Sequence, residues 1–232
     1  RYYKKLSFKQ HWPNALCRVA MKRFFSVNSD IFLRTLCLVS VSVFFTSTGA
    51  GEGEVILAVN TLLMQFFTLF SYVMDGFAYA GEALTGRYVG ANDFLMLRRL
   101  IRLLFRWGFG LSILFTLLYA FNGNAFIALL TDDEVVVAVS QEYYYWALAI
   151  PLAGFSAFIW DGIFIGATAT RYMLFSMLIA SVSFFIMFYF LHNQWANHAL
   201  WASFIVYLIL RGVMQSFFGK SIFRVKITRN ID

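Results

Sequence analysis

The chain has 232 residues, of which 60% are hydrophobic and 13% charged, and its formal net charge is +7. A typical soluble domain is about 45–50% apolar and about 25% charged. The composition excludes a water-soluble globular domain, which could not bury this much apolar surface. It also excludes intrinsic disorder, which requires low hydrophobicity and high charge. We therefore expect an all-α, polytopic membrane protein. Its positive charge is interpreted as a sign of membrane topology, and we expect no nucleic-acid partner.

Six stretches are apolar and long enough for spanning helices, which need about 20 residues each. In chain order they cover residues 31–49, 55–88, 100–121, 135–167, 172–191 and 199–218. Pro151 lies inside the fourth stretch and should kink that helix, because proline removes a backbone donor. The polar break between the fifth and sixth stretches contains His192 and His198, and His11 precedes the first stretch. We therefore expect all three histidines to lie outside the helices.

The charges of the connections alternate along the chain. Both ends and every second connection together carry 16 Lys and Arg residues, whereas the remaining connections carry five acidic residues and no cation: Glu52, Glu54, Asp132, Asp133 and Glu134. The positive-inside rule then places both termini in the cytoplasm. We expect a basic interfacial linker at 1–23, a six-helix transmembrane lobe at 24–218 and a basic cytoplasmic tail at 219–232.

Asp161 is the ionisable residue that lies deepest in a predicted span. It precedes Arg171 by ten residues, which is up to about 15 Å along a helix and close to the middle of the bilayer. A charge at this depth costs at least about 2.5–3.5 kcal/mol and indicates a functional site, although a carboxylate satisfied by a neighbouring helix is the structural alternative. Gly162 and Gly166 follow it as a small-residue pair that favours close helix packing.

Asp75 and Glu82 lie seven residues apart on one face of the second predicted helix, with Tyr79 between them. Gly86 and Gly90 continue the same stripe. Both acids are candidates for ion coupling. The alternative is a helix end that reaches cytoplasmic water.

Asp30 and Arg34 are spaced as a local i, i+4 ion pair at the start of the first helix, just after a potential Asn28 cap. They are coupling candidates, with capping and the local pair as the alternative. Arg211, near the cytoplasmic end of the last helix, could extend its side chain to that surface. Asn60 could line a polar path or form a hydrogen bond to another helix.

No signature of a catalytic centre is present. The sequence lacks HExxH, GxSxG and Walker A motifs, and Cys17 and Cys37 have no metal-ligand spacing. We therefore expect neither an enzyme nor a bound cofactor or metal.

Four segments resemble one membrane-transport family. The segments Met74–Asp93 (MDGFAYAGEALTGRYVGAND) and Trp160–Arg171 (WDGIFIGATATR) are similar to the multidrug and toxic compound extrusion (MATE) exporters, in particular to their DinF-like branch. Residues 24–51 and 197–212 resemble the same branch. Their order and spacing match the C-terminal half of that family.

The resemblance implies one six-helix lobe of a twelve-helix transporter. Such exporters move organic cations or amphipathic compounds against protons or sodium ions, by alternating access. By resemblance, the partners are the bilayer of a bacterial inner membrane, small organic substrates and an N-terminal lobe, which carries a membrane acid that this chain lacks. A non-transporting six-helix subunit that packs against a partner is the alternative, and a channel is a third hypothesis.

Overall fold

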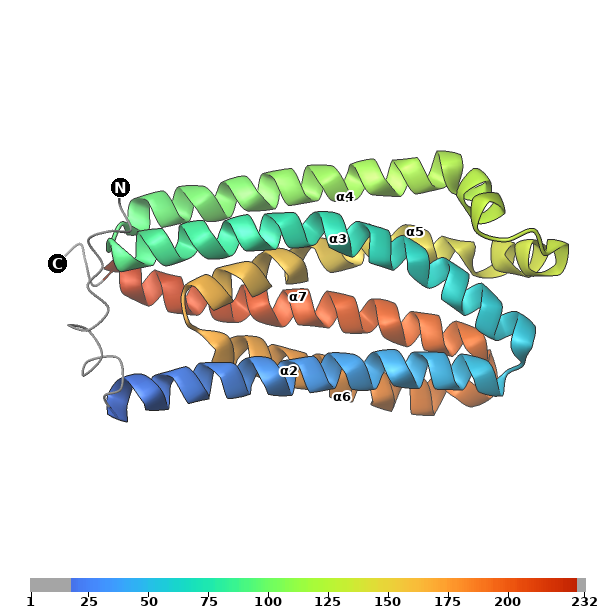
Figure 1. Cartoon of the computed structure of the whole chain (residues 1–232), viewed down its shortest axis with the longest axis horizontal. Helices are drawn as coiled ribbons and strands as arrows, with labels where there is room; N and C mark the ends of the chain where they lie inside the picture. Colours follow the sequence, from blue (N-terminus) through green and yellow to red (C-terminus); the bar gives the residue numbers. More distant parts are fainter. Residues whose placement is uncertain (1–17, 229–232) are drawn as a thin grey trace, which may run out of the picture.

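The computed structural model describes residues 18–228, and this part of the chain forms six long helices (Figure 1). Their order is α2 (Arg18–Gly51), α3 (Glu54–Gly90), α4 (Phe94–Leu130), α5 (Glu134–Gly166), α6 (Thr170–Trp195) and α7 (Asn197–Thr228). Each contains a segment long and apolar enough to cross a membrane. The all-helical, six-span prediction is therefore confirmed.

The helices extend beyond the apolar stretches that predicted them. α2 already begins at Arg18 and α7 continues to Thr228, so parts of the predicted linker and tail are helical. The rest of both, at 1–17 and 229–232, lies outside the described residues. The placement of His192 and His198 outside the helices is wrong, since α6 ends and α7 begins on either side of a tight turn at Ala196. α5 continues through Pro151 as one helix.

Short connections separate the helices, and local interactions explain where several of the helices begin. Asp93 caps α4, because its side chain accepts a hydrogen bond from the Met96 backbone N–H at 3.0 Å. Asp133 caps α5 in the same way through Val135 and Val136. Gly53, between α2 and α3, has a φ of 115°, which an L-residue with a side chain rarely adopts.

α5 and α7 form the centre of the bundle. α5 packs on α3, α4 and α7, while α6 packs on α7 and α2. Figure 1 shows α4 along one edge and α2 with α6 along the opposite edge, with α3, α5 and α7 between them. α2 and α4 keep most of their apolar side chains exposed, which suits a surface covered by lipid or by another membrane segment.

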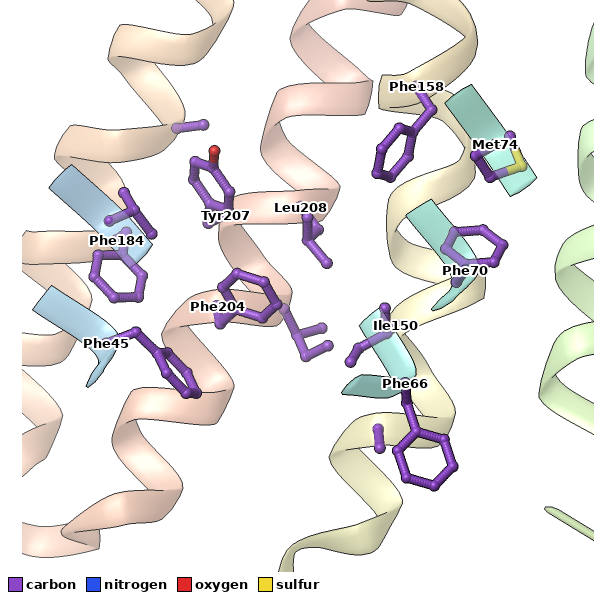
Figure 2. Packing of buried hydrophobic residues seen from close by; sticks show 14 of the residues in the cluster. Phe45, Phe66, Phe70, Met74, Ile150, Phe158, Phe184, Phe204, Tyr207 and Leu208 are labelled. Atoms are coloured by element: carbon purple, nitrogen blue, oxygen red, sulfur yellow. The ribbon is translucent and has the colours of Figure 1, made fainter. Parts of the chain in front are cut away.

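Aromatic side chains fill the space between these helices (Figure 2). Phe70 of α3 meets Phe158 of α5 edge-on, with ring centroids 6.0 Å apart. Phe45 of α2 meets Phe204 of α7 at 5.5 Å. Such edge-to-face pairs contribute about 0.5–1.5 kcal/mol beyond the area that they bury. This packing holds α5 and α7 as a fixed frame for the polar residues between them.

Candidate coupling site

Asp161 lies at the centre of a buried polar cluster formed by three helices. It belongs to α5, and its side chain is only 8% exposed. Its Oδ2 accepts hydrogen bonds from Arg34 of α2 and Arg211 of α7. Its Oδ1 accepts one from the Gln215 amide, one turn further along α7, at 2.6 Å. The three donors satisfy both oxygens of a carboxylate that could not otherwise remain charged in an apolar interior.

The two arginines of this cluster differ in burial. The Arg211 side chain is 3% exposed and its guanidinium also lies 5.6 Å from the Phe158 ring centroid. The Arg34 side chain is 17% exposed. The interpretation that Arg211 extends to the cytoplasmic surface is wrong, because the buried carboxylate holds it inside the bundle. Arg34 is the more accessible partner of Asp161.

Asp30 forms a separate polar contact. Its Oδ2 accepts a hydrogen bond from the Thr170 hydroxyl at 2.8 Å, which joins α2 to the first residue of α6. The local Asp30–Arg34 pair suggested by their spacing gives way to these long-range partners. Thr170 donates a hydrogen bond to Asp30, and Arg34 donates one to Asp161. Because Asp161 is buried, its charge needs a cationic partner more than that of the partly exposed Asp30 does.

Asp75 lies on α3 next to the cluster, and Glu82 lies about two turns further along the same helix. Asp75 is partly exposed and close enough to interact electrostatically with Asp161, Arg211 and Arg34. Glu82 is also partly exposed. Two arginines and two aspartates thus share this region.

The predicted small-residue pair of α5, Gly162 and Gly166, brings that helix into close contact with the backbone of α3. A Cβ at Gly162 would fall on the Ala78 carbonyl group, 2.7 Å from its carbon, and one at Gly166 would approach the Glu82 carbonyl carbon to 3.0 Å. A Cβ at Gly86 would lie 3.4 Å from the Gly166 carbonyl oxygen. The close contact ends there, since a Cβ at Gly90 would meet no neighbouring atom within 4 Å.

Gly162→Ala is expected to destabilise the protein, because the new methyl group collides with rigid backbone. Overpacking costs about 1–3 kcal/mol, and the fixed Ala78 carbonyl places this change near the upper limit. Thermal unfolding in detergent, followed by intrinsic fluorescence, should show a midpoint lower by several degrees. Gly90→Ala is the matched control and should leave the midpoint unchanged. Equal midpoints for the two variants would contradict the backbone contact.

A second buried polar group joins α3 to α7 near the α2–α3 and α6–α7 turns. The amides of Asn60 and Asn197 exchange two hydrogen bonds, at 2.8 and 3.0 Å, and the Trp201 indole donates to Asn60 Oδ1 at 2.8 Å. Gly49 of α2 leaves room for this contact, since a Cβ there would lie 2.8 Å from the Asn60 nitrogen. Of the two alternatives for Asn60, the structure shows the hydrogen bond to another helix.

The same end of the bundle holds two histidine–glutamate pairs. His192 Nδ1 lies 4.0 Å from Glu52, and His198 Nε2 lies 3.4 Å from Glu142. Burial raises the pKa of the Glu52 carboxyl, and the charge of the nearby His192 opposes this effect. These pairs are spread over different elements, and no group of three metal-ligating side chains occurs among residues 18–228.

Comparison with known proteins identifies the family. Residues 31–191 match the model of the MatE family. The chain is 37% identical to DNA damage-inducible protein F of Escherichia coli over 193 residues, covering 83% of this chain and 42% of that protein. It is 23% identical to Protein DETOXIFICATION 42 of Arabidopsis thaliana over 196 residues, covering 83% of this chain and 37% of that protein.

The fold is that of one lobe of a known transporter. The Vibrio cholerae MATE transporter VcmN, in its bent form, superposes with a TM-score of 0.74 and 20% sequence identity, over 90% of this chain and 46% of VcmN. The chain thus spans less than half the length of the relatives that it matches. With the family model covering most of its helices, this multi-pass membrane chain belongs to the MatE family of transporters.

Proposed function

We propose that the chain is the C-terminal lobe of an ion-coupled multidrug exporter. It would work with an N-terminal lobe and move organic cations or amphipathic compounds outward against protons or sodium ions. Repeat-built transporters bind near the bilayer midplane and rock one repeat against the other. The observation that carries the proposal is Asp161, a buried carboxylate five residues before the end of α5, whose hydrogen bonds join α2, α5 and α7.

The cluster suggests how ion binding changes the lobe. α2 packs mainly on α6 and α3, and Arg34 is its polar connection to α5. A proton or sodium ion at Asp161 competes with Arg34 for the carboxylate and weakens that connection. The more deeply buried Arg211 keeps its place on α7. Ion binding would thereby favour one arrangement of α2 relative to α5, as alternating access requires.

The substrate would meet the lobe on the exposed face of α3. Tyr72 and Tyr79 are 71% and 70% exposed, and Asp75 lies between them at helical spacing. An aromatic ring attracts an organic cation by about 0.5–2 kcal/mol, and a carboxylate nearby adds charge attraction. This face offers both kinds of contact to a flat, positively charged compound.

The charge pattern supports the orientation of the lobe. Arg98, Arg99 and Arg102 lie at the start of α4 and Arg171 lies at the start of α6. These two helix starts lie at the same end of the bundle (Figure 1), whereas the α2–α3 and α4–α5 connections are acidic. We infer from the positive-inside rule that the basic end faces the cytoplasm of a bacterial inner membrane.

Transport by the protein at its full natural length tests the proposal directly. We expect proteoliposomes to move a fluorescent organic cation such as ethidium when a proton or sodium gradient is imposed, and the effective gradient identifies the ion. The controls are vesicles that contain the protein but have no imposed gradient, and liposomes without the protein. Passive ethidium leak that ignores both gradients would indicate a channel, and no movement under either gradient would favour a non-transporting subunit.

A further inference from the structure

A basic cavity lies between the start of α2 and the α5–α6 turn. Its volume is about 800 Å³. Arg18 and Lys22 line it from α2, and Arg171 lines it from the first turn of α6. All three cationic side chains are exposed, so they can reach a ligand at the mouth of the cavity.

The cavity has an excess of positive charge. Asp30 is its acidic lining residue, and its Oδ2 already accepts a hydrogen bond from Thr170. Three cations and one carboxylate leave a formal charge of +2 among these lining residues. This arrangement attracts an anion, and basic pockets between transmembrane helices are typical sites for anionic lipid headgroups.

An apolar groove continues from this cavity along the same two helices. It has a volume of about 330 Å³ and is lined from α2 by Leu33 and Leu36, and from α6 by Leu174, Leu178 and Val182, among others. On each helix its first lining residue follows the last one of the basic cavity by less than one turn. The two cavities therefore lie one after the other along the α2–α6 seam, with the charge at the helix starts and the apolar part further along both helices.

The dimensions fit a lipid. From Leu174 to Phe185 the groove follows α6 for 11 residues, which is about 16 Å. One leaflet of the hydrocarbon core is about 15 Å deep. A soluble anion would use the basic cavity alone, whereas the adjoining groove matches an acyl chain in length and polarity.

We propose that the α2–α6 seam binds an anionic phospholipid, with its phosphate headgroup in the basic cavity and one acyl chain in the apolar groove. Nothing in this site depends on which ion or substrate the protein transports. The lipid would contact both ends of the Asp30–Thr170 hydrogen bond, which joins α2 to α6.

Lipid binding to the purified full-length protein tests the site, with phosphatidylglycerol as the probe and native mass spectrometry as the readout. Removing two charges with Lys22→Gln and Arg171→Gln should weaken phosphatidylglycerol binding roughly 25-fold, since each basic residue near a membrane surface contributes about fivefold. The matched control removes two exposed charges of α4, Arg98→Gln and Arg102→Gln, and should change binding less than twofold. Val182→Trp, which fills the groove, should also weaken binding.

Three results would overturn the proposal. Equal losses in the two double variants would show general attraction to basic protein. Equal affinity for zwitterionic phosphatidylethanolamine would show that the cavity does not recognise charge. If inorganic phosphate bound as tightly as the lipid and Val182→Trp left phosphatidylglycerol binding unchanged, the cavity would be a site for soluble phosphate.

Discussion

Asp161→Asn is expected to abolish gradient-driven export and to reduce the yield of folded protein. The asparagine side chain has the same shape but no charge, so Arg34 and Arg211 lose the anion to which both donate. Breaking a buried ion pair by removing one partner costs about 3–5 kcal/mol. The export rate should be measured at equal amounts of monodisperse protein, which separates lost transport from lost folding.

Asp132→Asn is the control for this experiment. It makes the same chemical change at an exposed position in the α4–α5 connection, and both export and thermal stability should be unaffected. Asp161→Asn protein that folds and still exports at the wild-type rate under a gradient would contradict the coupling role of Asp161.

The sequence was sufficient to predict the six spans and to single out Asp161, which the structure places in a buried polar cluster, because hydropathy and one charge inside an apolar stretch are strong local signals. The Gly162–Gly166 pair was predictable for the same reason, since small residues four apart share a helix face. These features depend on residues close together in the chain.

The partners of Asp161 could not be predicted in this way. Arg211 is 50 residues away along the chain, and an arginine near a helix end has an equally plausible path to the membrane surface. Arg34 had a suitable acid four residues away, and only the fold shows that it reaches Asp161. Gln215 carries no charge, so hydropathy and charge in the sequence do not mark it as a partner of Asp161.

Arg34→Gln is expected to uncouple transport from the ion gradient while the protein stays folded. Asp161 keeps Arg211 and Gln215 in this variant, so a neutral buried pair remains. The lobe loses the partner with which the coupling ion competes, and α2 is no longer tied to α5 in the ion-free state. Allosteric coupling is typically 1–3 kcal/mol, so the ratio of export with a gradient to export without one should fall roughly tenfold or more.

Arg211→Gln is the matched comparison, because it makes the same change on the other side of Asp161. Arg211 is more deeply buried than Arg34, at 3% against 17% exposure, and also contacts Phe158. Losing a buried, charged hydrogen bond costs about 1.5–3 kcal/mol, so this variant should unfold at a clearly lower temperature than Arg34→Gln. If Arg34→Gln retained the wild-type ratio, or if Arg211→Gln were the stable and uncoupled variant, Arg34 would not be the residue that exchanges with the ion.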